Sequence, residues 1–126
     1  RTMQISGSAP YMSPEQCQSK AADKRSDIYS AACVIYEVLT GRQPFAGSSD
    51  YETMHKQIFD KVQFKPQDNI WPPIEKLLLG CLEKDPNARY QDCREVLAEL
   101  EKLNEQYSTG WQQAKVKPAS KPKASR

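Results

Sequence analysis

The hydrophobic pattern of the chain is helical, and its strongest element runs from Ser26 to Thr40. Within this stretch apolar side chains fall on every side of a helix rather than on one stripe. A helix with this pattern is normally buried all round, and about fifteen residues are too few to span a bilayer. Gly41 follows as a C-terminal cap. We therefore expect a central, fully buried helix with other helices packed around it.

Capping residues predict two shorter helices on either side of the central one. The sequence Ser13-Pro14-Glu15-Gln16 combines a serine cap, a proline at the first helical position and a glutamine that completes a capping box. The sequence Ser49-Asp50-Tyr51-Glu52 is a second capping box and opens a helix that runs to about Asp60. The polar segment 61–69 that follows is predicted to be a loop.

Two later helices complete the pattern. Pro72-Pro73 begins the first of them, and Asp85-Pro86 ends it. Asp92 and Glu95 cap the second, whose apolar residues form one stripe along the helix. The residues of this stripe are Cys93, Val96, Leu97, Leu100, Leu103 and Tyr107.

The composition changes after the last helix. Residues 108–126 are rich in lysine, proline, serine and alanine, which is typical of a disordered tail. We predict a folded body over residues 1–107 and a basic tail over 108–126, with no credible strand and no internal repeat. The fold class is therefore all-α. The chain begins at Arg1, and its central helix has few partners, so we expect it to be part of a longer protein.

Composition and charge exclude several classes of protein. The 126 residues include 18 basic and 16 acidic side chains, enough for one small domain. Five of the basic residues lie in the last twelve positions, so the body is mildly acidic. A basic tail on an acidic body is a weak indication of a nucleic-acid or acidic-membrane partner. A tail that is charged only because it is solvated is the simpler explanation, so we expect no nucleic-acid partner. Neither a membrane segment nor a signal peptide is present in the sequence.

The four cysteines have no spacing typical of a zinc or redox site. Cys17, Cys33, Cys81 and Cys93 are widely separated, and Cys33 and Cys93 fall on apolar faces where a free thiol acts as a small hydrophobe. Two disulfides remain possible, but no feature favours them. Unpaired thiols suit a reducing compartment, so we expect a cytoplasmic location and no metal ligands.

The order of four motifs resembles the helical C-lobe of a protein kinase. The segment from Gly7 to Gln16 resembles the end of an activation segment, with Ser13-Pro14-Glu15 in place of A-P-E. The run that starts at Asp27 resembles the long buried helix of the lobe, and the segment from Gly41 to Phe45 resembles the turn after it. The segment from Leu82 to Tyr90 resembles the loop before the last helix. The likeness covers residues 1 to about 105 and is greatest to bacterial serine/threonine kinases of the eukaryotic-like type, whose complete fold is two-lobed and α+β.

This resemblance implies roles for several residues. It implies a buried ion pair between Glu15 and Arg89, which would tie the activation segment to the base of the lobe. Asp27 would anchor the catalytic loop, although an aspartate at a helix start is also favoured by the helix dipole. Thr2 is a candidate phosphosite, and an ordinary flexible hydroxyl is the alternative. The substrate-docking segment would consist of Gly7, Ser8, Ala9, Pro10 and Tyr11, with Ser8 where the family usually has threonine.

The motifs that perform phosphoryl transfer are absent from the sequence. No two glycines are separated by a single residue, no Asp-Phe-Gly occurs, and the only histidine, His55, is followed by Lys56 and so cannot start an H-R-D motif. We expect His55 to be a surface residue. These residues alone should therefore not transfer phosphate, and we assign them no catalytic, cofactor-binding or metal-binding residue. ATP and magnesium would be bound by the parent kinase.

Three hypotheses about function follow. The first is the C-terminal piece of a serine/threonine protein kinase, which supports the activation segment and docks protein substrates. Its other partner would be the N-terminal portion of the kinase, and without that portion its apolar helix should self-associate. The second is a non-catalytic kinase remnant that serves as an interaction module. An unrelated helical bundle is the third, and the ordered motifs make it the weakest.

Overall fold

The computed structural model describes residues 8–116, and the side chains up to Ser108. Every regular element in this part is helical, which confirms the all-α class. In chain order the elements are η1 (Ala9–Tyr11), α1 (Pro14–Cys17), α2 (Lys24–Thr40), α3 (Asp50–Phe59), η2 (Pro66–Asp68), α4 (Pro72–Cys81), η3 (Pro86–Ala88) and α5 (Cys93–Val116).

The capping residues act much as the sequence predicts. The hydroxyl of Ser13 accepts from the backbone N–H of Gln16, and the Gln16 side chain accepts from the Ser13 N–H, so the first capping box is complete. Gly41 ends α2 with φ at +78°, a left-handed conformation that glycine adopts without strain. Ser49 also caps α3, but the carboxylate of Glu52 accepts from Ser48 instead of Ser49. The second capping box is therefore only half formed.

Two predicted helix ends are wrong. Helix α4 ends at Cys81, before the predicted stop at Asp85-Pro86, where Asp85 instead caps the short helix η3 by accepting from the Asn87 N–H at 2.9 Å. Helix α5 continues through Gly110 to Val116, into the segment predicted to be a tail. The rest of that segment lies outside the described residues, so the division of the chain at residue 107 stays a prediction.

The segment 61–69 is better fixed than its polar composition suggests. Val62 and Phe64 pack against the core, and the guanidinium of Arg42 donates to both carboxylate oxygens of Asp68, at 2.5 and 2.7 Å. These contacts fasten η2 to the end of α2. The loop prediction did not include this packing, because Val62 and Phe64 are isolated apolar residues in a polar segment.

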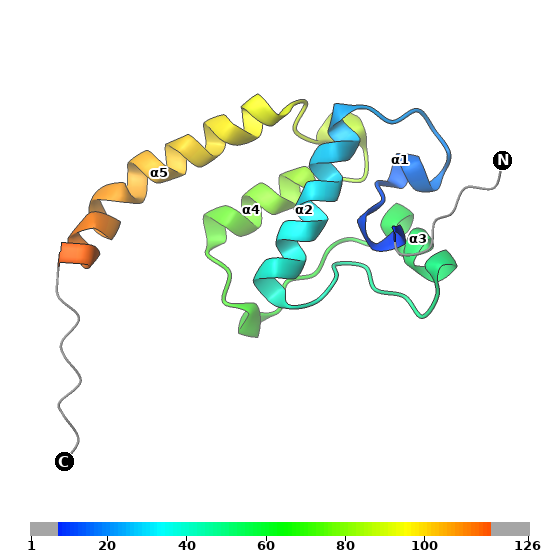
Figure 1. Cartoon of the computed structure of the whole chain (residues 1–126), viewed down its shortest axis with the longest axis horizontal. Coiled ribbons are helices and arrows are strands. Elements are labelled where there is room, and N and C mark those ends of the chain that lie inside the picture. Colours follow the sequence, from blue (N-terminus) through cyan, green and yellow to red (C-terminus); the bar gives the residue numbers. More distant parts are fainter. Residues whose placement is uncertain (1–7, 117–126) are drawn as a thin grey trace, which may run out of the picture.

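Helix α2 is the centre of the fold (Figure 1). Helix α4 lies against it, and η1 contacts both α2 and α3. The core gathers where these elements meet, and the side chain of Tyr29 is fully buried within it. Core residues are Ile28, Tyr29, Ala32, Cys33, Phe45, Leu78, Cys81 and Leu82.

The other face of α2 contradicts the expected all-round burial. Val38 is 77% exposed, and Val34, Ile35 and Leu39 are between 43% and 48% exposed. Within residues 8–108 the elements that cover α2 pack on its opposite side, so this apolar face meets solvent. The expectation of a fully buried helix is therefore wrong for this chain.

Helix α5 extends away from the rest of the molecule (Figure 1). Val96 and Leu103 of its apolar stripe are partly buried, but Cys93 and the remaining members are exposed. The ring of Tyr107 contacts Trp71 edge-on, with ring centroids 4.6 Å apart. An apolar groove of about 690 Å³ lies between α4 and α5 at this contact. The stripe is thus a real face of the helix, but only two of its six residues are partly buried.

Candidate functional site

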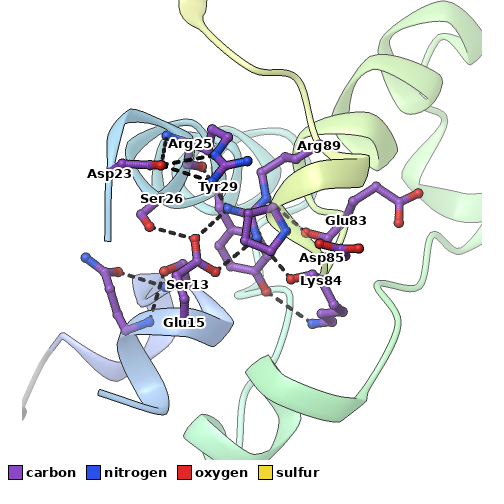
Figure 2. A network of polar contacts seen from close by, with 12 residues as sticks. Ser13, Glu15, Asp23, Arg25, Ser26, Tyr29, Glu83, Lys84, Asp85 and Arg89 are labelled. Carbon is purple, nitrogen blue, oxygen red and sulfur yellow. Dashed lines mark hydrogen bonds and ion pairs between the residues drawn. The ribbon is translucent and has the colours of Figure 1, made fainter. Parts of the chain in front are cut away.

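A buried ion pair joins two segments that lie far apart in the sequence. The carboxylate of Glu15, on the short helix α1, faces the guanidinium of Arg89, just after η3 (Figure 2). Arg89 donates from Nη1 to Oε2 at 2.8 Å and from Nη2 to Oε1 at 3.1 Å. Glu15 is 6% exposed and Arg89 is 3% exposed. The structure therefore brings together the pair that the resemblance implied, in the bidentate geometry that suits arginine.

The polar atoms of this pair have further partners. Ser26, in the first turns of α2, donates its hydroxyl to Glu15 Oε2 at 2.6 Å. Arg89 also donates to the backbone carbonyls of Glu83, Lys84 and Arg25, at 2.9 to 3.2 Å. Within the described part of the chain, no buried side-chain nitrogen or oxygen lacks a partner. These hydrogen bonds offset the cost of burying the charge pair, because a buried polar group without a partner carries its full desolvation penalty.

The protonation of Glu15 reflects two opposing effects. Burial raises the pKa of its carboxyl group, but the hydrogen bonds from Arg89 and Ser26 outweigh burial and hold the pKa below its usual value. The carboxylate is therefore charged at neutral pH. The charge is needed for the pair to form.

Tyr29 and Lys84 extend the polar network beside the ion pair (Figure 2). The guanidinium carbon of Arg89 lies 5.0 Å from the centre of the Tyr29 ring, and Lys84 Nζ donates to the Tyr29 hydroxyl at 3.1 Å. The same ammonium lies 3.7 Å from the centre of the Phe45 ring, a cation–π distance. Burial lowers the pKa of Lys84 to about 8.

The predicted docking segment is held from beneath by side chains of α2 and α3. Gln57 donates its amide to the carbonyls of Ala9 and Pro10, at 3.1 and 2.8 Å. Tyr11 donates to Glu37 Oε1 at 2.6 Å, and this bond raises the pKa of the Tyr11 phenol. Ser8 is exposed. A hollow of about 300 Å³ opens on this surface, lined by Ser8, Tyr11, Met12, Gln16 and Ser30.

The remaining predicted residues have no special contacts here. Thr2 and Gly7 lie outside the described residues. Asp27 is exposed in the first turn of α2, and its side chain makes no hydrogen bond to another described residue; Asp23 caps the helix instead. His55 is exposed, as expected, with its ring against Phe59.

Sequence reasoning missed three polar residues of the network: Ser26, Gln57 and Lys84. Gln57 is completely buried although it lies on a helix with mostly polar residues. Thr53, one turn earlier on the same face, is buried as well. No pattern in the sequence separates these residues from ordinary surface positions.

The described residues contain no metal-ligating cluster, no disulfide and no helix that could span a membrane. Between residues 8 and 116, no group of three or more histidine, cysteine, aspartate or glutamate side chains could hold a metal. The cysteines in this range are unpaired thiols, two buried, Cys17 half-buried and Cys93 exposed. In the same range no helix is both long and apolar enough to cross a bilayer.

Comparison with known proteins agrees with the geometry. Residues 1–100 match the protein kinase domain family. The chain is 35% identical over 107 residues to serine/threonine-protein kinase PknB of Mycolicibacterium smegmatis, covering 83% of this chain and 17% of PknB. It is 39% identical over 105 residues to the probable serine/threonine-protein kinase CPE1738 of Clostridium perfringens, covering 81% of this chain and 15% of that protein. The chain therefore spans about a sixth of the length of the relatives it matches.

The chain belongs to the protein kinase domain family. The relatives cited here are named serine/threonine-protein kinase or probable serine/threonine-protein kinase, and all are bacterial. The bacterial serine/threonine type that the motifs resembled is thus confirmed.

Proposed function

We propose that this chain is the helical C-terminal part of a serine/threonine protein kinase domain. The parent would transfer the γ-phosphate of ATP to serine and threonine hydroxyls of proteins. One observation supports this proposal above the others: the buried pair of Glu15 and Arg89 joins α1, which follows the predicted docking segment, to the loop before α5. A bidentate pair fixes both distance and orientation, which a positioning role requires.

We assign the chain two tasks in the parent, support and docking. The Glu15–Arg89 pair supports the activation segment, and residues 7–11 dock the protein substrate beside the hollow lined by Ser8 and Tyr11. ATP and magnesium belong to the parent and not to these residues. The exposed apolar face of α2 fits the N-terminal portion of the kinase as a second partner. Thr2 is the candidate phosphosite, and Asp27 the candidate anchor of the catalytic loop.

Kinetics of the complete reading frame would test the docking task. Ser8 is exposed and its side chain caps no helix, so Ser8→Arg places a bulky cation at the hollow without disturbing the fold. If protein kinase activity is found, we expect this change to raise KM for a protein substrate about tenfold and to leave kcat nearly unchanged. Ala98→Arg, on the exposed surface of α5, is the matched control and should leave both constants unchanged.

Two results would contradict the proposal. If the complete reading frame contained no H-R-D and D-F-G motifs, the parent would not be a kinase. If Ser8→Arg left KM for the protein substrate unchanged, docking by residues 7–11 would be wrong. Calorimetry of the 126-residue chain alone should give no heat of binding with magnesium-ATP, and measured binding would count against the assignment of ATP to the parent.

A non-catalytic interaction module is the second candidate function. The observation in its favour is the apolar face of α2, with Val38 77% exposed. Monomeric proteins seldom expose such a face without a partner. This candidate predicts a complete reading frame without H-R-D and D-F-G motifs, and a chain that binds another protein through α2. Reading the complete coding sequence therefore distinguishes the interaction module from the kinase part.

A further inference from the structure

A line of hydrogen bonds connects the loop before α5 to the docking segment. Lys84 Nζ donates to the Tyr29 hydroxyl at 3.1 Å, and the Tyr29 hydroxyl donates to Gln57 Oε1 at 2.5 Å. The Gln57 amide then donates to the carbonyls of Ala9 and Pro10. These five residues come from four separate parts of the chain.

The direction of every bond in this line is fixed by chemistry. A lysine ammonium can only donate, so the Tyr29 oxygen must accept from it and use its own proton toward Gln57. The Gln57 oxygen therefore accepts, which leaves its NH₂ group for the two carbonyls. A carboxylate in place of Gln57 would have no proton for the carbonyls. The residue types are thus matched to the order of the bonds.

The two middle residues of this hydrogen-bond line are buried. Tyr29 and Gln57 are fully buried, and a buried polar group is costly unless its partners are present. Lys84 has no carboxylate partner among the described residues; its ammonium contacts the Tyr29 hydroxyl, the Lys56 carbonyl at 3.4 Å and the Phe45 ring. The ammonium is therefore used as a hydrogen-bond donor and not as half of a salt bridge.

We propose that Lys84, Tyr29 and Gln57 form a directional hydrogen-bond relay that fixes the backbone of Ala9 and Pro10. Gln57, which bonds the two carbonyls itself, and Lys84, which acts through Tyr29, are then positioning residues for the docking segment and do not contact substrate. The role in docking rests on the proposed function, whereas the relay itself is a property of this chain.

Amide hydrogen exchange of the full 126-residue chain, followed by NMR, tests the relay. The N–H groups of Tyr11 and Met12 bond to carbonyls of Ser8 and Ala9 and so report on η1. Tyr29→Phe removes the hydroxyl and keeps the ring. We expect exchange at Tyr11 and Met12 to rise about tenfold, because one buried hydrogen bond is worth roughly a factor of ten.

Tyr36→Phe is the matched control, since Tyr36 is an equally buried tyrosine on the same helix. Its hydroxyl donates to the Gln63 carbonyl, away from η1, so its loss should leave exchange at Tyr11 unchanged. Equal exchange at η1 in Tyr29→Phe and the natural chain would overturn the relay. Equal acceleration in both phenylalanine variants would also overturn it, because the effect would then be general loosening.

Lys84 gives a second test that does not depend on a fully buried residue. Lys84→Met keeps the length of the side chain but removes the donor, so exchange at η1 should rise, and Lys84→Arg should restore most of the protection. A methionine variant with natural exchange at Tyr11 and Met12 would overturn the part played by Lys84.

The relay and the docking role can fail separately. If the Tyr29→Phe variant loosens η1 but leaves KM for a protein substrate unchanged in the longer kinase, the relay stands and docking by this segment is wrong. If exchange is unchanged, the relay is wrong whatever KM does.

Discussion

Two regions of α2 show opposite relations between polarity and burial. Near its start, Ser26 is buried together with the charged pair of Glu15 and Arg89. Toward its end, Val34 and Val38 lie in solvent. Burial in this chain therefore follows the available partners and not hydrophobicity alone. The polar region is covered because α1, the start of α2 and the loop that carries Arg89 meet there, whereas no described element covers the apolar one.

The comparison also separates two kinds of stability. The polar region depends on completed hydrogen bonds, so the loss of one partner leaves a buried group unsatisfied. The apolar face of α2 has few contacts to lose. Substitutions in the polar region should therefore lower stability far more than substitutions on the apolar face.

Arg89→Met should remove about 3–5 kcal/mol from the free energy of unfolding, because it leaves the Glu15 carboxylate buried without its partner. Urea unfolding measures this loss. Arg94 provides the control: it is 89% exposed and pairs with Asp92 at 3.5 Å, so Arg94→Met should change stability by less than about 0.5 kcal/mol. Similar losses in both variants would contradict the distinction between buried and exposed charge pairs.

Leu78 and Leu79 are neighbours on α4 that test apolar burial in the same way. Leu78 is 2% exposed and Leu79 is 41% exposed. Leu78→Ala should cost about 2–5 kcal/mol through lost contacts and a cavity, and Leu79→Ala much less. Thermal melting of the two variants checks the order, and a larger effect at Leu79 would show that a partner covers that face in solution.

The pH dependence of stability should reveal Lys84. Its pKa in the folded chain is lowered to about 8 by burial, below the ordinary lysine value of about 10.4. The unfolded chain then binds more protons between these values, so the contribution of Lys84 is fully present above the upper value and is lost as the pH falls toward 8. The titratable and charged groups around Lys84 are Glu15, Cys17, Tyr29, Cys33, Lys56, Asp60 and Arg89.

The difference in unfolding free energy between the natural chain and Lys84→Met isolates this effect. We expect it to shift by about 1 kcal/mol in favour of the natural chain between pH 7 and pH 9.5, after allowance for solvent screening. The thiols of Cys17 and Cys33 have pKa values raised to about 11 and about 12 by burial, and both chains share them. A pH-independent difference would show that Lys84 is not desolvated.

Val38→Lys should have the smallest effect on stability, within about 0.5 kcal/mol, because the side chain is already exposed. It should instead reduce self-association, which we propose for the uncovered face of α2. Sedimentation velocity over a range of concentrations measures this. A natural chain that stays monomeric throughout would make self-association wrong, and unfolding by Val38→Lys would mean that this face is covered.

Local features of the fold were predictable from the sequence. The capping box at Ser13 and the glycine stop at Gly41 depend on neighbouring residues only, and both are confirmed. The end of α4 was not predictable, because Asp85 and Pro86 suit the start of η3 as well as the end of a helix. Continuation of α5 through Gly110 was missed for a similar reason, since one glycine lowers helix stability without ending the helix.

The candidate site also contains residues that the sequence identified and residues that it did not. Motif order alone named Glu15 and Arg89, and their separation in the sequence gave no indication of the 2.8 Å contact. Gln57 and Lys84 could not be found, because a buried polar residue has no pattern of its own. Its burial depends on a donor or acceptor contributed by a distant segment.

By itself the sequence determined the helical class and the main caps, which residue types at short spacings encode, and the kinase family, which the order of four motifs along the chain indicates. Only the tertiary structure decided which side of α2 is covered and which polar residues share the interior. The physical reason is that burial is a property of pairs: an apolar side chain stays in solvent until another surface meets it, and a polar one enters the core only where its hydrogen bonds are completed.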